Sequence, residues 1–321
     1  MSEQCQKAKQ KTRATLSWIG LVLAGISLLL APSRVNTLAA SESVNFATLY
    51  HYAQRANDAY ASASTIKKRL PDVTRVATPG RTDVLYFLET NDKHKTQTVS
   101  VRGTIDKKNW ALDEDTKGVA DKKVGILVHA GFEKATNAIY ADLKSHLKPG
   151  YRIYITGHSL GGAVAALLMV YLHVDGHKIA RVVTFGQPKF TDQRGVAKYA
   201  NLPLTRVVNQ NDIVAMMPDS TQNGGATFAH IGAEINILTG PYYAVLNARE
   251  ANRKSIDQLG HDLFLSSVPD HKMKWYLKDL RDKLKTSKRV KYADRESYVV
   301  RHKLGTPTEP AKAKMNFNNS N

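Results

Sequence analysis

Short apolar runs alternate with longer segments of helical periodicity along most of this chain. The apolar runs have the length of strands and cover residues 84–90, 97–103, 124–128, 151–156, 182–185 and 204–209. Segments with helical spacing of apolar positions cover residues 46–60, 133–147, 160–174 and 193–199. The first two runs form a predicted hairpin that turns at Asn91 and Asp92. Because strands that alternate with helices pair in parallel, the pattern predicts an α/β fold with a mostly parallel central sheet flanked by helices.

The segment Gly157-His158-Ser159-Leu160-Gly161 joins one of these strands directly to a helix. Glycines on both sides of Ser159 leave room for a sharp and strained turn. The free N–H groups at the start of the helix would point toward a developing oxyanion. This arrangement is typical of a serine on a nucleophile elbow. The alternative interpretation is a Gly-Ser turn that only connects the two elements.

A serine nucleophile needs a base and a residue that orients the base, in the chain order Ser, Asp, His. Asp212 ends the turn-forming sequence Gln210-Asn211-Asp212, directly after the strand at residues 204–209. Since sites form at the carboxyl edge of a parallel sheet, Asp212 is the predicted orienting acid. The alternative role for Asp212 is that of an Asx-turn residue that caps the strand.

Three histidines downstream of Asp212 are candidates for the base, namely His230, His261 and His271. His230 lies in a run that alternates like a strand, so it is predicted to be a packed histidine. His271 follows a loop signature at residues 266–270 and precedes an amphipathic helix. Because a general base must reach into a cleft from a loop, His271 is the preferred candidate and His261 the second.

An oxyanion hole requires two backbone N–H groups, one of them from the residue after the nucleophile. Leu160 holds that position. Gly103 ends the strand at residues 97–103 and allows close backbone approach. Thr104 follows it and is therefore the candidate for the second N–H group.

Short motifs along residues 46–285 occur in one characteristic order. They are Val101-Arg102-Gly103-Thr104, Asn109-Trp110, Val128-His129-Ala130-Gly131-Phe132, the segment 155–163 around Ser159, Thr184-Phe185-Gly186-Gln187-Pro188, Arg206-Val207-Val208-Asn209 with Asp212 and Pro218, His230-Ile231-Gly232, and Asp270-His271 with Tyr276. In this order they resemble the class 3 lipases, the fungal-type group of the α/β-hydrolases. The resemblance implies ester hydrolysis by Ser159, Asp212 and His271, with oxyanion donors at Thr104 and Leu160. It also implies a structural role for the segment that contains His230.

The segment that would form a lid departs from the pattern of the fungal lipases. Within residues 105–120, only Ile105, Trp110 and Leu112 are large and apolar. So polar a lid offers little surface to a lipid interface, and we expect the best activity on esters of short to medium acyl chains.

Composition indicates one large domain with an N-terminal leader. The chain has 321 residues, of which 42% are hydrophobic, and we expect an α/β-hydrolase domain at residues 41–304 and a disordered tail at residues 305–321. Basic residues, a long uncharged run and small residues follow one another in residues 1–40, as in a secretory signal, although an uncleaved anchor remains an alternative. Cys5 in the leader is the only cysteine, so the domain has neither a disulfide nor a cysteine nucleophile.

The net charge of +18 is concentrated after the predicted base. Residues 272–303 contain twelve Lys or Arg and four Asp or Glu. This excess fits an anionic partner such as a membrane surface, or else a solvated helix face. Nucleic-acid recognition is not expected, because no zinc-finger or RNP-type pattern accompanies the charge.

Together these features predict an exported serine hydrolase that cleaves carboxylic esters of lipids, with no metal or organic cofactor. A phospholipase or acyltransferase with the same three residues is the alternative within enzymes. A catalytically idle domain that binds lipid or membrane is the alternative from another class.

We predict that the mature chain begins near residue 40 or 41 and is found outside the cytosol, because Ala39 and Ala40 resemble a processing site. N-terminal sequencing of the native protein tests this. A chain that begins at Met1 in a membrane fraction would show that the leader is an anchor.

Overall fold

The computed structural model describes residues 44–104, 117–218, 227–257 and 269–300. The expected leader and tail lie outside the described residues, as do His261 and most of the expected lid, residues 105–116. Within the described ranges, no helix is long and apolar enough to cross a membrane.

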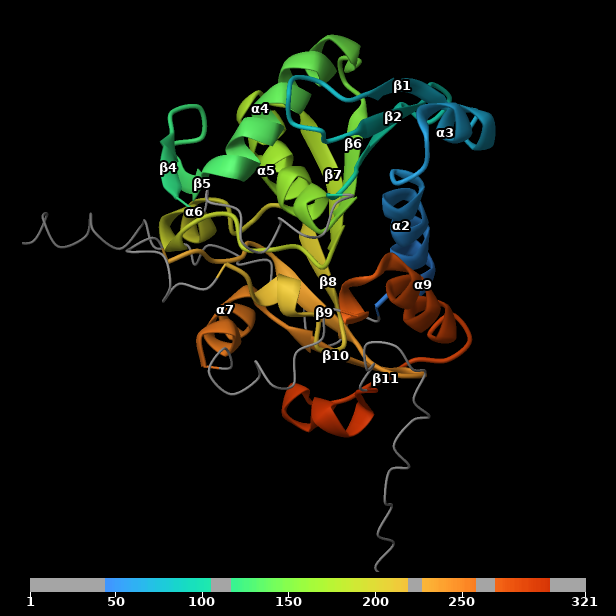
Figure 1. Ribbon diagram of the computed structural model, residues 1–321, viewed down its shortest axis with the longest axis vertical. Coiled ribbons are helices and arrows are strands. Elements are labelled where there is room, and N and C mark those ends of the chain that lie inside the picture. The colour runs from blue at the N-terminus through green and yellow to red at the C-terminus, as the bar shows by residue number, and fades with distance from the viewer. Residues whose placement is uncertain (1–43, 105–116, 219–226, 258–268, 301–321) are drawn as a thin grey trace, which may run out of the picture. The chain divides into compact units, whose positions relative to one another are not determined.

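A large, mostly parallel sheet forms the centre of the domain, as the alternation of strands and helices predicts (Figure 1). The described strands follow one another in the order β1-β2-β3-β6-β7-β8-β9-β10-β11. Neighbours from β3 to β9 are parallel, whereas β1, β2 and β3 are antiparallel, as are β9 and β10. The bounds are β1 Val73–Ala77, β2 Tyr86–Asn91, β3 Thr96–Val101, β6 Arg152–His158, β7 Lys178–Phe185, β8 Leu204–Asn209, β9 Ala233–Ile237, β10 Tyr242–Leu246 and β11 Lys288–Arg289.

Helices cover both faces of this sheet because side chains alternate along each strand. On β7, Val182 belongs to the core beneath α4 (Ala130–Leu143) and α5 (Leu160–Val174). The next residue, Val183, belongs to the core beneath α2 (Phe46–Asp58) and α9 (Met273–Asp282). The two helix pairs therefore lie on opposite sides of the strands (Figure 1).

Helix α5 has the bounds that its sequence pattern predicts, and it is apolar on all sides. Residues 161–172 are all buried, because α5 is covered by the sheet on one side and by α4 on the other. The remaining described helices are α3 Ala63–Arg69, α6 Gln193–Lys198 and α7 Ala248–Asp257, with short 3₁₀ helices at Lys144–His146, Ile213–Met216, Pro269–His271 and Tyr292–Tyr298.

One predicted strand lies outside the central sheet. Residues 124–128 were expected to take part in the alternating parallel pattern, but β5 (Ile126–His129) pairs antiparallel with β4 (Gly118–Asp121) in a separate two-stranded sheet. The Asp121 carboxylate accepts hydrogen bonds from two backbone N–H groups of the turn and closes a local hairpin. Meanwhile, β6 occupies the position beside β3.

Candidate active site

Ser159 lies on the turn between β6 and α5 in a conformation that few residues adopt. Its φ of 60° and ψ of −134° place it outside the usual regions. A Cβ atom on Gly157 would lie 2.2 Å from the Gly161 carbonyl oxygen, and one on Gly161 would lie 2.5 Å from the Val101 oxygen. The two glycines therefore allow the strand, the turn and the end of β3 to approach one another, as expected for an elbow.

The structure brings Ser159, His271 and Asp212 together although 112 and 59 residues separate them along the chain. Ser159 Oγ lies 2.8 Å from His271 Nε2. On the other side of the ring, His271 Nδ1 lies 2.8 Å from Asp212 Oδ2 and 3.1 Å from Oδ1. With the ring proton on Nδ1, Nε2 is free to accept the proton of the serine hydroxyl.

Asp212 is fully buried, and its carboxylate is held by two further donors. The Val214 N–H donates to Oδ1 at 2.9 Å, and the Tyr276 hydroxyl donates to Oδ2 at 2.6 Å. Burial, together with the neighbouring Asp212 carboxylate, raises the pKa of Tyr276 well above its usual value, so the hydroxyl keeps its proton and remains a donor. These bonds compensate the carboxylate for the water that it loses on burial.

His158 and Tyr60 also contact this group, although neither was predicted as a site residue. The His158 ring stacks on the His271 ring with centroids 4.5 Å apart. Its Nε2 donates to the His271 carbonyl oxygen at 2.8 Å, which leaves Nδ1 to accept from the Tyr60 hydroxyl at 2.7 Å. No sequence pattern indicated this role, because His158 occupies the variable position of the elbow motif and Tyr60 lies 98 residues earlier in the chain.

The loop that carries the acid is tied to the loop that carries the base. Asn209 Nδ2 donates to the Asp270 carbonyl oxygen at 3.0 Å, and the Asn211 N–H donates to the Asp270 carboxylate at 3.4 Å. Asp270 directly precedes His271. These bonds therefore fix the base relative to the strand that positions Asp212.

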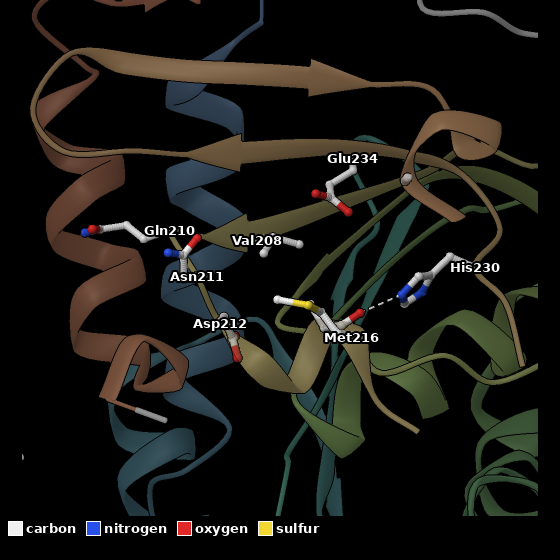
Figure 2. A pocket seen from close by; sticks show the side chains of 9 residues that line it. Val208, Gln210, Asn211, Asp212, Met216, His230 and Glu234 are labelled. Carbon is white, nitrogen blue, oxygen red and sulfur yellow. Dashed lines mark hydrogen bonds between the residues drawn. The ribbon is translucent and has the colours of Figure 1, made fainter. Parts of the chain in front are cut away.

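A small cavity lies beside Asp212. The cavity in Figure 2 lies among Asp212, Met216, His230 and Glu234 and has a volume of about 10 Å³, enough for about one water molecule. His230 Nε2 donates across this region to the Ala215 carbonyl oxygen at 2.8 Å. His230 is thus a buried, hydrogen-bonded residue behind the acid, and it precedes β9 instead of lying inside a strand.

The two candidate oxyanion donors lie where β3 ends and α5 begins. Thr104 follows β3, Leu160 is the first residue of α5, and both are half-buried. The close approach of Gly161 to Val101 brings these two ends of the backbone together. In the part of the chain that the structure describes, no three His, Cys, Asp or Glu residues are grouped so that they could hold a metal ion.

Comparisons with known proteins show that parts of this chain are similar to lipases. A family model for lipase (class 3) matches residues 98–222. The chain is 31% identical over 153 residues to the secreted mono- and diacylglycerol lipase 1 of Fusarium solani, covering 43% of this chain and 44% of that protein. It is 32% identical over 166 residues to a lipase of Rhizomucor miehei, covering 47% and 44% respectively. The matches thus span less than half the length of these relatives.

A solved structure extends the likeness beyond these segments. The lipase of Rhizopus microsporus var. chinensis superimposes with a TM-score of 0.59 and 23% sequence identity, covering 75% of this chain and 92% of that one. This likeness confirms the predicted α/β-hydrolase fold.

Gly186 follows β7, between the strands that position Ser159 and Asp212, and its φ is +53°. A Cβ atom there would lie 2.6 Å from Asp212 Oδ2 and 2.8 Å from His271 Nδ1. We predict that Gly186→Ala lowers kcat by about 10²-fold, since displacing Asp212 and His271 by about 1 Å has an effect of that size. Steady-state kinetics on a soluble ester measure this.

Gly176→Ala is the matched control, because Gly176 has a φ of +81° and no atom within 4 Å of an added Cβ. It introduces the same kind of backbone strain away from the site, and we expect kcat to be unchanged. Equal loss of kcat in the two variants would contradict the steric argument.

Proposed function

We propose that this chain, as a member of the class 3 lipase family whose model matches residues 98–222, is an exported serine hydrolase that cleaves carboxylic esters of lipids. The observation that carries the proposal is the continuous contact from Ser159 Oγ through the His271 ring to the buried Asp212 carboxylate. The relatives named as secreted lipases support both the ester substrate and export.

In the proposed acylation step, Ser159 Oγ attacks the acyl carbon of the ester while His271 Nε2 accepts the hydroxyl proton. The imidazolium is stabilised by Asp212, and the N–H groups of Thr104 and Leu160 stabilise the oxyanion. When the tetrahedral intermediate collapses, the bond to the alcohol breaks and His271 returns the proton to the leaving oxygen. The products are the free alcohol and an acyl-enzyme.

Water completes the proposed cycle by the same route. His271 accepts a proton from the water that attacks the acyl carbon, and the proton returns to Ser159 Oγ when the acid leaves. Tyr276 and Val214 each donate a hydrogen bond to Asp212. They hold the carboxylate in place while the charge on the ring changes.

A domain that only binds lipid would not require this geometry. In such a domain, a strained serine and a buried Asp–His pair would reduce stability without providing a function. An acyltransferase with the same residues remains the alternative within enzymes, and it differs only in the alcohol that accepts the acyl group.

We predict that the wild-type protein hydrolyses p-nitrophenyl esters and is labelled by a fluorophosphonate, and that Ser159→Ala loses the label and about 10⁴-fold or more of kcat. The rate should be highest for short to medium acyl chains, with a weak response to an oil–water interface, because the segment 105–120 has few large apolar residues. Near-normal turnover by Ser159→Ala would refute the mechanism. A sharp increase in rate on emulsified long-chain triglyceride would refute only the proposed chain length.

We also propose that exposed basic side chains in the described part of residues 272–303 bind anionic membranes. Lys272, Lys274 and Lys278 are exposed on or beside α9, directly after His271, and Lys288 and Lys291 are exposed further along. Two basic side chains do not contribute to this surface. Lys283 is buried and donates to three backbone carbonyls, and Arg295 is buried with its guanidinium over the Tyr292 ring.

Sedimentation with vesicles tests this second proposal. Each basic residue near an anionic surface contributes about 1 kcal/mol, so we predict that replacing Lys285, Lys288 and Lys291 by Ala weakens binding to phosphatidylglycerol vesicles by about 10²-fold or more at low salt. Replacing Lys67, Lys68 and Arg69, which are exposed on α3, is the matched control. Equal binding to neutral vesicles, or an equal effect of the control, would contradict the proposal.

A further inference from the structure

The last described segment, residues 288–300, packs along the edge of the central sheet and is called the C-terminal arm below. It begins with β11, which pairs with β10. The Thr239 N–H then donates to the Tyr298 carbonyl oxygen at 3.0 Å, and the rings of Tyr242 and Tyr298 lie 4.2 Å apart. The arm is thus attached to the β9–β10 hairpin at both of its ends.

From this edge, the arm reaches the loop that carries the acid. The Val300 N–H donates to Gln210 Oε1 at 2.6 Å, and Asn211 Nδ2 lies 3.4 Å from Glu296 Oε2. Gln210 and Asn211 are the two residues between β8 and Asp212. The arm therefore contacts both residues that directly precede the candidate acid in the chain.

Gln210 connects the arm to a second element. Its Nε2 donates to Asp279 Oδ2 of α9 at 2.8 Å, so the two ends of one amide contact α9 and the arm. The side-chain amide points toward α9 (Figure 2). Gln210 is 2% exposed, and it is therefore anchored within the interior.

The backbone of Gln210 adopts an uncommon conformation, which is also held by hydrogen bonds from its N–H to the Ile237 carbonyl oxygen and from Asn236 Nδ2 to its carbonyl oxygen, both at 2.9 Å. Its φ is +45°, in the left-handed region that residues other than glycine and asparagine seldom adopt. The Asp212 N–H donates to the Asn209 carbonyl oxygen at 2.9 Å and closes a tight turn around Gln210. A rotation of the backbone at Gln210 would therefore move the Asp212 carboxylate.

We propose that Gln210 is a positioning residue through which the C-terminal arm and α9 hold Asp212 in register with His271. This inference rests on the proposed function, because it concerns the same three residues. It assigns the arm a role in the chemistry although no part of the arm contacts the reacting groups. Its effect should appear in kcat with little change in KM, since substrate contacts are unaltered.

Two substitutions in the full-length protein test the proposal. Gln210→Asn tolerates the left-handed backbone but is too short to reach both partners. Val300→Pro removes the N–H donor of the arm and keeps the Gln210 side chain, and Val299 before it has φ −97° and ψ 136°, which suits a residue that precedes proline. We expect each variant to lower kcat by about 10-fold to 10²-fold, with KM within about threefold of the wild-type value.

Gln97→Ala is the matched control. Gln97 is 1% exposed, and its amide also contacts several partners, namely Thr90 Oγ1, the His146 carbonyl oxygen and the Lys148 N–H. It lies at the start of β3, outside the candidate site. Thermal unfolding of all three variants shows whether they are folded, and Gln97→Ala should lose stability while kcat stays at the wild-type value.

The outcomes separate this inference from the proposed function. If Gln210→Asn and Val300→Pro keep kcat within about twofold, or if Gln97→Ala loses as much kcat as they do, the arm has no positioning role. Ser159→Ala is measured in parallel. If Ser159→Ala retains turnover, the proposed function fails. If Ser159→Ala is inactive, the Gln210 and Val300 variants alone decide the positioning role.

Discussion

Parallel pairing of β6, β7 and β8 is the constraint on which the candidate site depends. Ser159 follows β6 and Asp212 follows β8, so two inter-strand spacings, or about 10 Å, separate their backbones. The imidazole of His271 fills that distance and crosses the end of β7. The residue that follows β7 must therefore lack a side chain, and it is Gly186. Sheet geometry thus determines both the spacing of the three residues and the one position between them that must be glycine.

Several buried polar groups around the site are hydrogen-bonded to one another. Asn209 and Asn211 donate hydrogen bonds to Asp270, and Gln210 donates one to Asp279 of α9. Behind them, Arg206 of β8 and Glu234 of β9 form a buried ion pair at 3.0 Å. Removing one member of such a set leaves its partner desolvated and unpaired. The acid loop is consequently held from several directions, in keeping with a carboxylate whose position must not vary.

Basic residues near the C-terminus are either exposed or buried, which composition cannot distinguish. Most are exposed, but burial lowers the pKa of Lys283 to about 8, with Asp279 opposing this change. Its ammonium group joins α9 to the carbonyls of Leu238 and Gly240, and so to the hairpin on which the arm rests. Part of the positive charge therefore stabilises the region behind the acid, and only the remainder is available to an anionic surface.

The sequence alone determined the central features of this protein, because turns, loops and strand–helix alternation each produce a recognisable pattern of neighbouring residues. The glycines around Ser159 marked the elbow, the turn residues after β8 marked Asp212, and the loop before α9 distinguished His271 from His230. The alternation of strands and helices predicted the parallel sheet. Each of these features depends on residues that are close together along the chain.

Only the tertiary structure decided which distant residues surround Ser159, His271 and Asp212. It placed β5 outside the central sheet, stacked His158 on His271, and brought Tyr276 and Asp279 to the acid loop. Such partners are separated by tens of residues, for example 69 between Gln210 and Asp279. A polar residue in a sequence does not specify which buried group it will satisfy, because that choice depends on how the strands and helices pack.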